Sequence, residues 1–212
     1  MKMKAAWIVL CLALAGAATA APRAQGQAGE FDFYVLSLSW SPTFCLTHPD
    51  DQQCSGKGYG FVLHGLWPQY AKGGWPASCA PQSRLSREEL DKGAALFPTR
   101  ALLKHEWAKH GTCSGLEPLD YLAKTDQALG VVVIPPQLQP FNTPPALPAR
   151  EIEALFRESN PRLGNHGLAV ICKGKVLSEV RVCLTKDLAF AGCPRSVKSQ
   201  CRDGDIRIPA QR

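Results

Sequence analysis

Eight cysteines lie downstream of residue 20, and they constrain this chain more than any other feature. An even number of cysteines in an exported protein indicates disulfide bridges, here four. The sequence contains no Cys-x-x-Cys motif, which disfavours a metal or redox site. Eight cysteines can pair in on the order of 100 ways, so their number alone leaves the pairing open. The eight are Cys45, Cys54, Cys79, Cys113, Cys172, Cys183, Cys193 and Cys201.

The N-terminus carries the pattern of a secretory signal peptide. Lys2 and Lys4 precede an apolar run over residues 5–18, which ends in the small-residue triplet 18–20. The run is shorter than the roughly 20 residues that span a bilayer, which disfavours a transmembrane helix. We expect cleavage after Ala20, with the ninth cysteine, Cys11, leaving in the signal. Residues 21–212 are then a single domain in the periplasm or outside the cell, with no membrane anchor.

The chain is mildly basic. Its formal net charge is +6 and its pI about 8.9. Lys2 and Lys4 contribute two of those charges, which leaves about +4 after the predicted cleavage. A positive surface suits a polyanion such as nucleic acid, although many exported proteins are equally basic.

Strand and helix patterns are mixed along the chain. Residues 33–40 alternate, with Leu36, Leu38 and Trp40 on one face, and predict a strand with one buried side. A second predicted strand covers residues 59–64 and ends at His64, where Gly65 lets the chain turn. Helices are predicted over 88–96, where Ser86 and Glu89 have capping-box spacing, from Thr99 to near Gly111, and over 119–129 and 149–158.

The second half of the chain completes the predicted fold. Residues 168–172 and 176–184 predict a β-hairpin, and the proline-rich stretch 131–148 predicts an irregular loop at the border of the cleft. Because strands and helices do not alternate as regular βαβ units, we predict an α+β fold. Its central, mainly antiparallel β-sheet is flanked by helices and stabilised by disulfides.

Two short segments concentrate the reactive side chains. They are His64-Gly65-Leu66-Trp67-Pro68 and residues 105–113, and they hold three of the five histidines. On a helix, His105 and Lys109 are four residues apart, as are Glu106 and His110, so these side chains share one helix side. One short helix thus presents imidazole, carboxylate and ammonium groups together.

These residue types meet the needs of metal-free RNA cleavage. The reaction requires a base for the ribose 2′-hydroxyl, an acid for the leaving 5′-oxygen, and positive charge for the phosphorane. Two histidines supply the first two, and a lysine with a further imidazole supplies the third. DNA lacks the 2′-hydroxyl and cannot react.

Each group also has a simpler interpretation. A lone His64 is more often a hydrogen-bonded structural histidine, Glu106 and His110 could be only a helix pair, and tryptophans are more often core. The more specific alternative to RNA cleavage is a zinc-peptidase helix. That motif needs a histidine four residues after His105, but this position is Lys109, whose ammonium group would repel zinc. We therefore expect no metal and no cofactor.

The two segments resemble the active-site segments of the T2 family of ribonucleases, in a bacterial periplasmic or secreted form. The resemblance implies that His64 and His110 are the acid–base pair, that His105 binds the phosphate, and that Glu106 and Lys109 stabilise the pentacovalent state. It leaves open which histidine is the base in the first step. The implied products are 2′,3′-cyclic phosphates and then 3′-phosphates.

The resemblance also implies the remaining features. Its disulfides would be Cys45–Cys54, Cys79–Cys113, Cys172–Cys201 and Cys183–Cys193. Trp67, Gln69, Tyr70 and Trp75 are candidates for the base site, and the amide of Gln69, where some members carry an acidic residue, gives no clear base preference. The expected partner is single-stranded RNA, with no cleavage of DNA, and we expect a monomer. The alternative is a catalytically inactive relative that binds RNA or protein.

Overall fold

The structure is a computed structural model that describes residues 26–80, 83–139 and 142–211. The predicted signal peptide, residues 1–20, lies outside the described residues. Within those residues, every helix is too short or too polar to cross a membrane.

One mixed sheet organises the fold. Its strand order is β2-β1-β5-β6-β3, and β4 pairs with β5. All pairings are antiparallel except the single parallel pair between β5 and β6, which confirms the predicted mainly antiparallel sheet. The strands are β1 Phe33–Trp40, β2 Phe61–Gln69, β3 Ala146–Pro148, β4 Leu168–Lys173, β5 Val176–Leu184 and β6 Asp205–Arg207.

The helices begin where the sequence places their caps. Ser86 and Glu89 form a reciprocal capping box before α2, and the Thr99 hydroxyl accepts a hydrogen bond from the Leu102 amide at the start of α3. The predicted helices are therefore confirmed, with ends shifted by one to three residues. The helices are α1 Ser41–Cys45, α2 Arg87–Gly93, α3 Arg100–Lys109, α4 Pro118–Val131 and α5 Ala149–Ser159.

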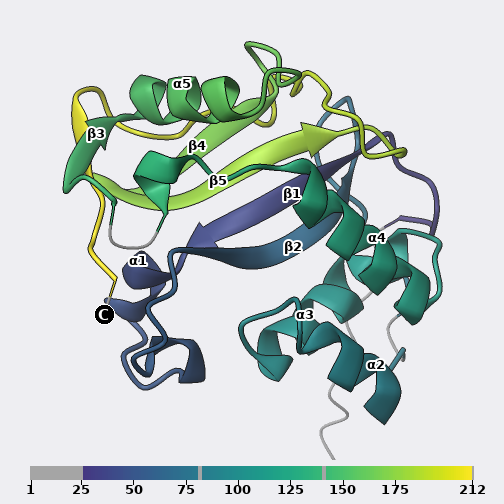
Figure 1. The fold of residues 1–212 in the computed structure, drawn as a ribbon. Helices are drawn as coiled ribbons and strands as arrows, with labels where there is room; N and C mark the ends of the chain where they lie inside the picture. Colours follow the sequence, from purple (N-terminus) through teal and green to yellow (C-terminus); the bar gives the residue numbers. More distant parts are fainter. Residues whose placement is uncertain (1–25, 81–82, 140–141, 212) are drawn as a thin grey trace, which may run out of the picture.

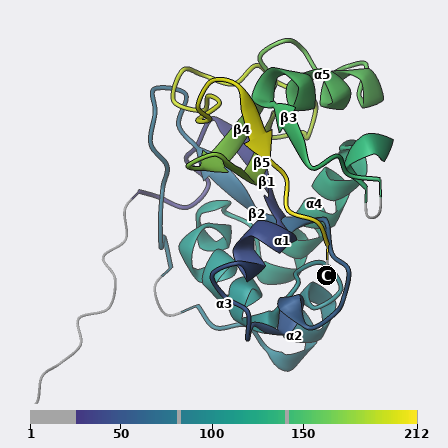
Figure 2. The ribbon, with the colours of Figure 1, turned by 90° about the vertical axis from the view of Figure 1, so that its left-hand side faces the viewer.

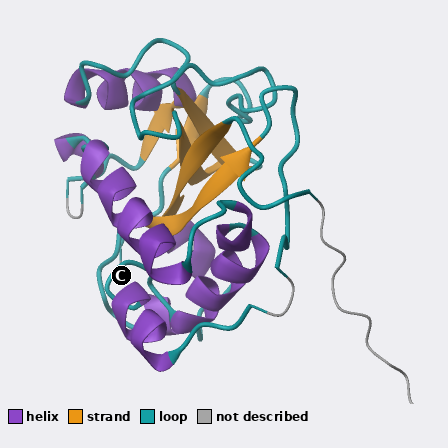
Figure 3. Ribbon diagram, turned by 90° about the vertical axis from the view of Figure 1, so that its right-hand side faces the viewer, coloured by secondary structure: helices purple, strands orange, loops and turns teal. Residues whose placement is uncertain are grey.

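The helices gather along one side of the strands, and loops cover part of the other side (Figure 3). Helix α5 lies at one end of the sheet, and α2, α3 and α4 lie towards the other (Figures 1 and 2). The main core fills the space between sheet and helices and includes Leu36, Leu66, Leu103, Tyr121 and Phe156. This burial removes apolar surface from water and drives the layers together.

Strand β1 is buried on both faces, so the prediction of one buried side was wrong. Ser37 is fully buried, and Phe33 and Val35 form a second, smaller cluster with Cys183. Partly buried Val197 packs against that cluster and covers it. The alternation of leucine and serine marked only the side that faces the helices.

The prediction that the second strand ends at His64 was wrong, because β2 continues to Gln69. Ser37 pairs with Gly65 while Leu38 pairs with Leu63, which leaves His64 as the extra residue of a β-bulge. The bulge shifts the alternation by one residue. Leu63 and Leu66, three positions apart, therefore both join the main core.

The hairpin and the disulfides agree with the predictions. Strands β4 and β5 pair antiparallel around the turn at Gly174. In the proline-rich stretch, residues 136–138 form a 3-10 turn and 146–148 form β3, while residues 140–141 lie outside the description. The bridges are Cys45–Cys54, Cys79–Cys113, Cys172–Cys201 and Cys183–Cys193, the four pairings implied by the resemblance.

Candidate active site

A cavity of about 290 Å³ lies where the edge strand β2 meets α3. It brings together all five predicted catalytic residues and three of the four predicted base-site residues. The proline-rich stretch, expected at the border of the cleft, is not among the described residues that line it. The lining side chains with reactive or polar groups are His64, Trp67, Gln69, Trp75, His105, Glu106, Lys109, His110, Arg181 and Ser196.

The bulge in β2 places His64 in this cavity. Because one extra residue shifts the alternation, His64 and Trp67 both lie on the side of the sheet away from the main core. Their rings meet edge to face with centroids 5.0 Å apart. Bulges commonly re-aim a side chain next to an active site, and here the bulge turns an imidazole towards α3.

The end of α3 supplies the other four candidates. His110 is the C-cap residue, and its amide donates to the Glu106 carbonyl at 2.9 Å. The Lys109 carbonyl accepts from the Ser78 amide at 2.8 Å, next to the Cys79–Cys113 bridge. This end of the helix is therefore held in place by a backbone hydrogen bond and a covalent link.

The Glu106 carboxylate packs over the sheet at Gly65. Its Oε2 accepts a hydrogen bond from Trp67 Nε1 at 2.5 Å, and the residue is only 1% exposed. A Cβ atom on Gly65 would overlap both that carboxylate and the Trp67 indole. Only glycine at this position lets α3 and β2 approach closely enough to share the cavity.

Charge is unevenly distributed over half-buried His64 and buried His110. Burial by itself lowers the pKa of His64, but its hydrogen bond to Glu179 and the charges of Glu179 and Glu106 raise it above its ordinary value. Burial and the charges of Lys109, His64 and His105 lower the pKa of His110 to about 3. The surroundings of His64 therefore favour its charged form, and those of His110 favour its neutral form.

The remaining two α3 residues have different surroundings. Partial burial and the charges of Lys109 and His64 lower the pKa of exposed His105. Burial raises the pKa of Glu106, although the charges of His64 and Lys109 and the Trp67 hydrogen bond act in the opposite direction. An imidazole with a lowered pKa and a carboxyl with a raised pKa thus face one cavity.

Two functional candidates on β5 were missed from the sequence. Glu179 is 7% exposed and lies 2.5 Å from His64 Nδ1 through its Oε1 atom. Arg181 binds the other oxygen of Glu179 and lies over the Trp67 ring, with its guanidinium carbon 5.2 Å from the ring centroid. The available signal was two charged residues spaced by two within the apolar run 176–184, which places both on one face of the strand.

The four base-site candidates separate in the structure. Trp75 is 51% exposed and lines the cavity, as does Gln69, whose amide nitrogen donates to the Pro68 carbonyl at 3.0 Å. The Trp67 ring packs against the rings of His64 and His110, and its Nε1 donates to Glu106. Tyr70 is not among the residues lining the cavity, because its hydroxyl lies beside Gly26.

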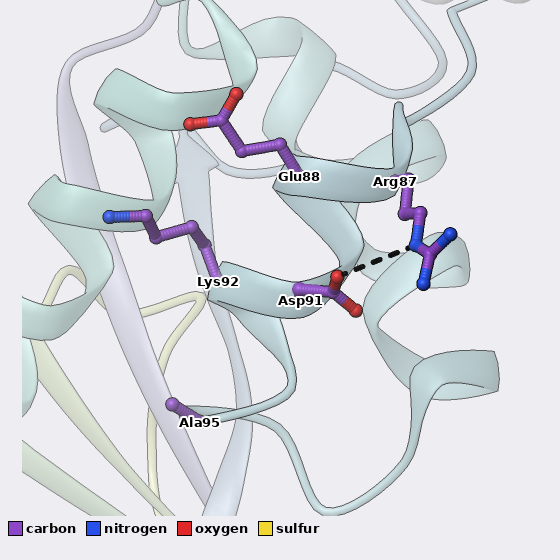
Figure 4. A pocket seen from close by; sticks show the side chains of 5 residues that line it. All are labelled: Arg87, Glu88, Asp91, Lys92 and Ala95. Carbon is purple, nitrogen blue, oxygen red and sulfur yellow. Dashed lines mark ion pairs between the residues drawn. The ribbon is translucent and has the colours of Figure 1, made fainter.

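Other hollows lack this combination of groups. One of about 650 Å³ on α2 is lined by Arg87, Glu88, Asp91, Lys92 and Ala95. Arg87 and Asp91 form an ion pair there at 4.0 Å, and Glu88 and Lys92 extend from the same helix (Figure 4). That hollow has no histidine. In the part of the chain that the structure describes, no cluster of three or more His, Cys, Asp or Glu side chains is arranged to hold a metal ion.

The α+β fold and a histidine-lined cavity at the junction of β2 and α3 define a class that comparison with known proteins identifies. A family model described as the Ribonuclease T2 family matches residues 31–193. The chain belongs to the ribonuclease T2 family.

Individual relatives agree with this family. A ribonuclease from Aeromonas hydrophila is 47% identical over 119 residues, which cover 56% of this chain and 54% of the relative. A probable ribonuclease from Haemophilus influenzae is 30% identical over 164 residues, covering 66% of this chain and 55% of the relative. This chain thus spans about half the length of these two relatives.

The fold is shared with solved structures. An RNase-related protein from Calystegia sepium aligns with a TM-score of 0.71 and 26% identity, covering 86% of this chain and 99% of that one. The likeness therefore covers most of this chain.

Proposed function

We propose that this protein is an endoribonuclease that cleaves single-stranded RNA by transphosphorylation, through 2′,3′-cyclic phosphates to 3′-phosphate ends. The observation that carries the proposal is the convergence of His64, His105, Glu106, Lys109 and His110 on one cavity. Membership of the ribonuclease T2 family and the names of the relatives support it.

The pKa shifts of the two histidines favour His110 as the base and His64 as the acid in the first step. In the first step, neutral His110 takes the proton of the 2′-hydroxyl, and the 2′-oxygen bonds to phosphorus. The bond from phosphorus to the 5′-oxygen breaks as His64 gives its Nε2 proton to that oxygen. In the second step His64, now neutral, deprotonates water, and the water oxygen bonds to phosphorus. The bond from phosphorus to the 2′-oxygen breaks as His110 gives its proton back to that oxygen.

The remaining groups stabilise the charge that develops on the phosphorane. Lys109 and His105 face the cavity from adjacent turns of α3 and attract the phosphate oxygens. Burial raises the pKa of Glu106, and its Oε1 atom lies 3.5 Å from His64 Nε2, close enough to interact with the charge of that ring. Trp75 and Gln69 line the same cavity and offer a stacking surface and an amide for a base.

The proposal extends to setting and partners. None of these steps requires a metal or cofactor, and DNA lacks the nucleophile. Four disulfides fit an oxidising compartment and support a periplasmic or secreted protein. We propose in addition that the protein acts as a monomer.

The test is an incubation of the purified, oxidised protein with an RNA oligonucleotide and its all-DNA counterpart in EDTA, followed by mass spectrometry of the product ends. We expect cleavage of RNA only, with cyclic or 3′-phosphate ends. The His110→Ala variant should lose cleavage while it retains most of its affinity for RNA.

Two outcomes would contradict the proposal. If the wild-type protein binds RNA but leaves it intact, the chain is a binding module. If EDTA abolishes cleavage and zinc restores it, the chemistry depends on a metal.

A further inference from the structure

We propose that Glu179 is a positioning residue for catalysis, whose two carboxylate oxygens hold His64 and Arg181 in place at the cavity wall. This inference rests on the proposed function, because it assigns Glu179 a role in the cleavage that His64 carries out. Glu179 belongs to neither of the two segments singled out from the sequence, and it lies 115 positions after His64 in the chain.

The sheet register brings the three side chains together. Strand β1 lies between β2 and β5, and Ser37 pairs with Gly65 on one side and with Arg181 on the other. Gly65 and Ser37 are small, so longer side chains can pass over this row of the sheet. His64, displaced by the bulge, reaches across β1 to Glu179.

Each oxygen of Glu179 has its own partner. Oε1 lies 2.5 Å from His64 Nδ1, and Oε2 accepts from Arg181 Nη2 at 2.7 Å and Nε at 3.0 Å. Burial raises the pKa of Glu179, but the bonds and charges of His64 and Arg181 outweigh it and lower that pKa to about 2. An ionised carboxylate only accepts hydrogen bonds, so Nδ1 must carry hydrogen and Nε2 is the atom left for the reaction.

The charged form of His64 is favoured by some of its neighbours and opposed by others. Glu179 from β5 and Glu106 from α3 favour the imidazolium, whereas Arg181 from β5 and the histidines of α3 oppose it. The charged and titratable groups that act on His64 or feel its charge are Glu179, Arg181, Glu106, His105 and His110. Glu179 is the only one of these described groups that also hydrogen-bonds to the ring.

Arg181 gives Glu179 a second role. The guanidinium lines the cavity and lies over Trp67, the residue that donates to Glu106. A permanently charged group fixed in this way can attract a substrate phosphate. Glu179 therefore fixes the orientation of one proton-transfer group and the position of one cation.

The Glu179→Gln variant tests the role of the carboxylate at nearly constant volume. An amide has one acceptor oxygen, so it can serve His64 or Arg181 but not both, and it carries no charge. We expect the alkaline limb of the pH–rate profile to move to lower pH, and kcat at its optimum to fall roughly 10- to 100-fold with a smaller change in KM.

A direct titration separates this inference from the proposed function. The His64 ring signals, assigned by their loss in a His64→Ala variant, are followed by NMR against pH in both proteins without substrate. We expect His64 to titrate at lower pH in Glu179→Gln than in the wild-type protein. This readout is valid even if the protein cleaves no RNA.

Two further variants complete the design. Glu153→Gln removes a partly buried carboxylate that hydrogen-bonds to Ser199 and should leave the His64 titration unchanged. Arg181→Gln removes a charge that lowers the pKa of His64, so it should move the titration in the opposite direction from Glu179→Gln. Melting by circular dichroism verifies that each variant is folded.

The inference is overturned if folded Glu179→Gln shows the wild-type His64 titration. It is also overturned if that titration moves while the kcat and pH–rate profile of an active protein stay at wild-type values. A Glu153→Gln shift as large as that of Glu179→Gln would show a general charge effect and would equally contradict a specific role.

Discussion

His64 Nε2 lies 3.5 Å from Glu106 Oε1, although one residue comes from a bulge in β2 and the other from the C-terminal half of α3. The carboxylate is fixed by Trp67 and buried, so its position relative to the imidazole is set by packing rather than by a flexible surface contact. This relationship joins the two segments singled out from the sequence into one candidate site, and the pKa shifts of its histidines lead to the first prediction.

RNA cleavage should have a bell-shaped dependence on pH, with its optimum on the acidic side of neutral. Protonation of His110, whose pKa is lowered to about 3, removes the base at low pH. Deprotonation of His64, whose pKa is raised above 6.5, removes the acid at high pH. Initial rates measured across the range check this, and a flat profile from about pH 4 to about pH 9 would contradict the paired histidines.

The neutral state of buried His110 should also make the free energy of unfolding depend on pH. Because its folded pKa is below its unfolded value, the unfolded chain binds more protons between pH 6.5 and about 3. Stability should therefore fall as pH falls through that window, with a contribution on the order of a few kcal/mol.

Replacing His110 by phenylalanine should make this acid-dependent loss shallower in urea unfolding series. His166→Ala, at an exposed histidine, serves as the control and should keep the wild-type slope. Equal slopes in wild type and His110→Phe would show that His110 is not held neutral.

Gly65→Ala should disable the site through a single methyl group. The added Cβ overlaps the Glu106 carboxylate and the Trp67 indole, so these groups must shift. We expect kcat to fall on the order of 100-fold and stability to fall by about 1–3 kcal/mol.

Gly130→Ala is the matched control for this change. Gly130 lies in the last turn of α4, and its added Cβ would meet nothing within 4 Å. Alanine there should leave kcat unchanged and raise stability by roughly 0.5–1 kcal/mol. Wild-type kcat in Gly65→Ala would show that the close approach at β2 is unimportant for catalysis.

The Cys79–Cys113 and Cys45–Cys54 disulfides should differ in their effect on activity. Replacing Cys79 and Cys113 by alanine should cost about 2–5 kcal/mol and lower kcat roughly tenfold, because that bridge holds the end of α3. Replacing Cys45 and Cys54, which close a shorter loop away from the cavity, should reduce the melting temperature with little change in kcat. Equal losses of kcat in the two double variants would argue against a specific role for the first bridge.

The amino-acid sequence determined the features that depend on local spacing. The capping residues Ser86 and Thr99 start α2 and α3 where the sequence predicts, because a cap needs only a side chain two or three residues from a free amide. The segments that hold His64 and residues 105–110 were recognisable for the same reason. The four-residue spacings within α3 place its reactive groups on one side of the helix.

The tertiary structure decided what depends on strand register and on contacts between distant segments. The bulge that turns His64 towards α3 arises from the pairing of β2 with β1, and neither strand reveals it alone. Arg181 reaches the cavity and Glu179 reaches His64 because β5 lies beside β1, although Glu179 is 115 positions after His64 in the chain. A one-residue change of register would turn these side chains to the other face of the sheet, so only the folded pairing sets their chemistry.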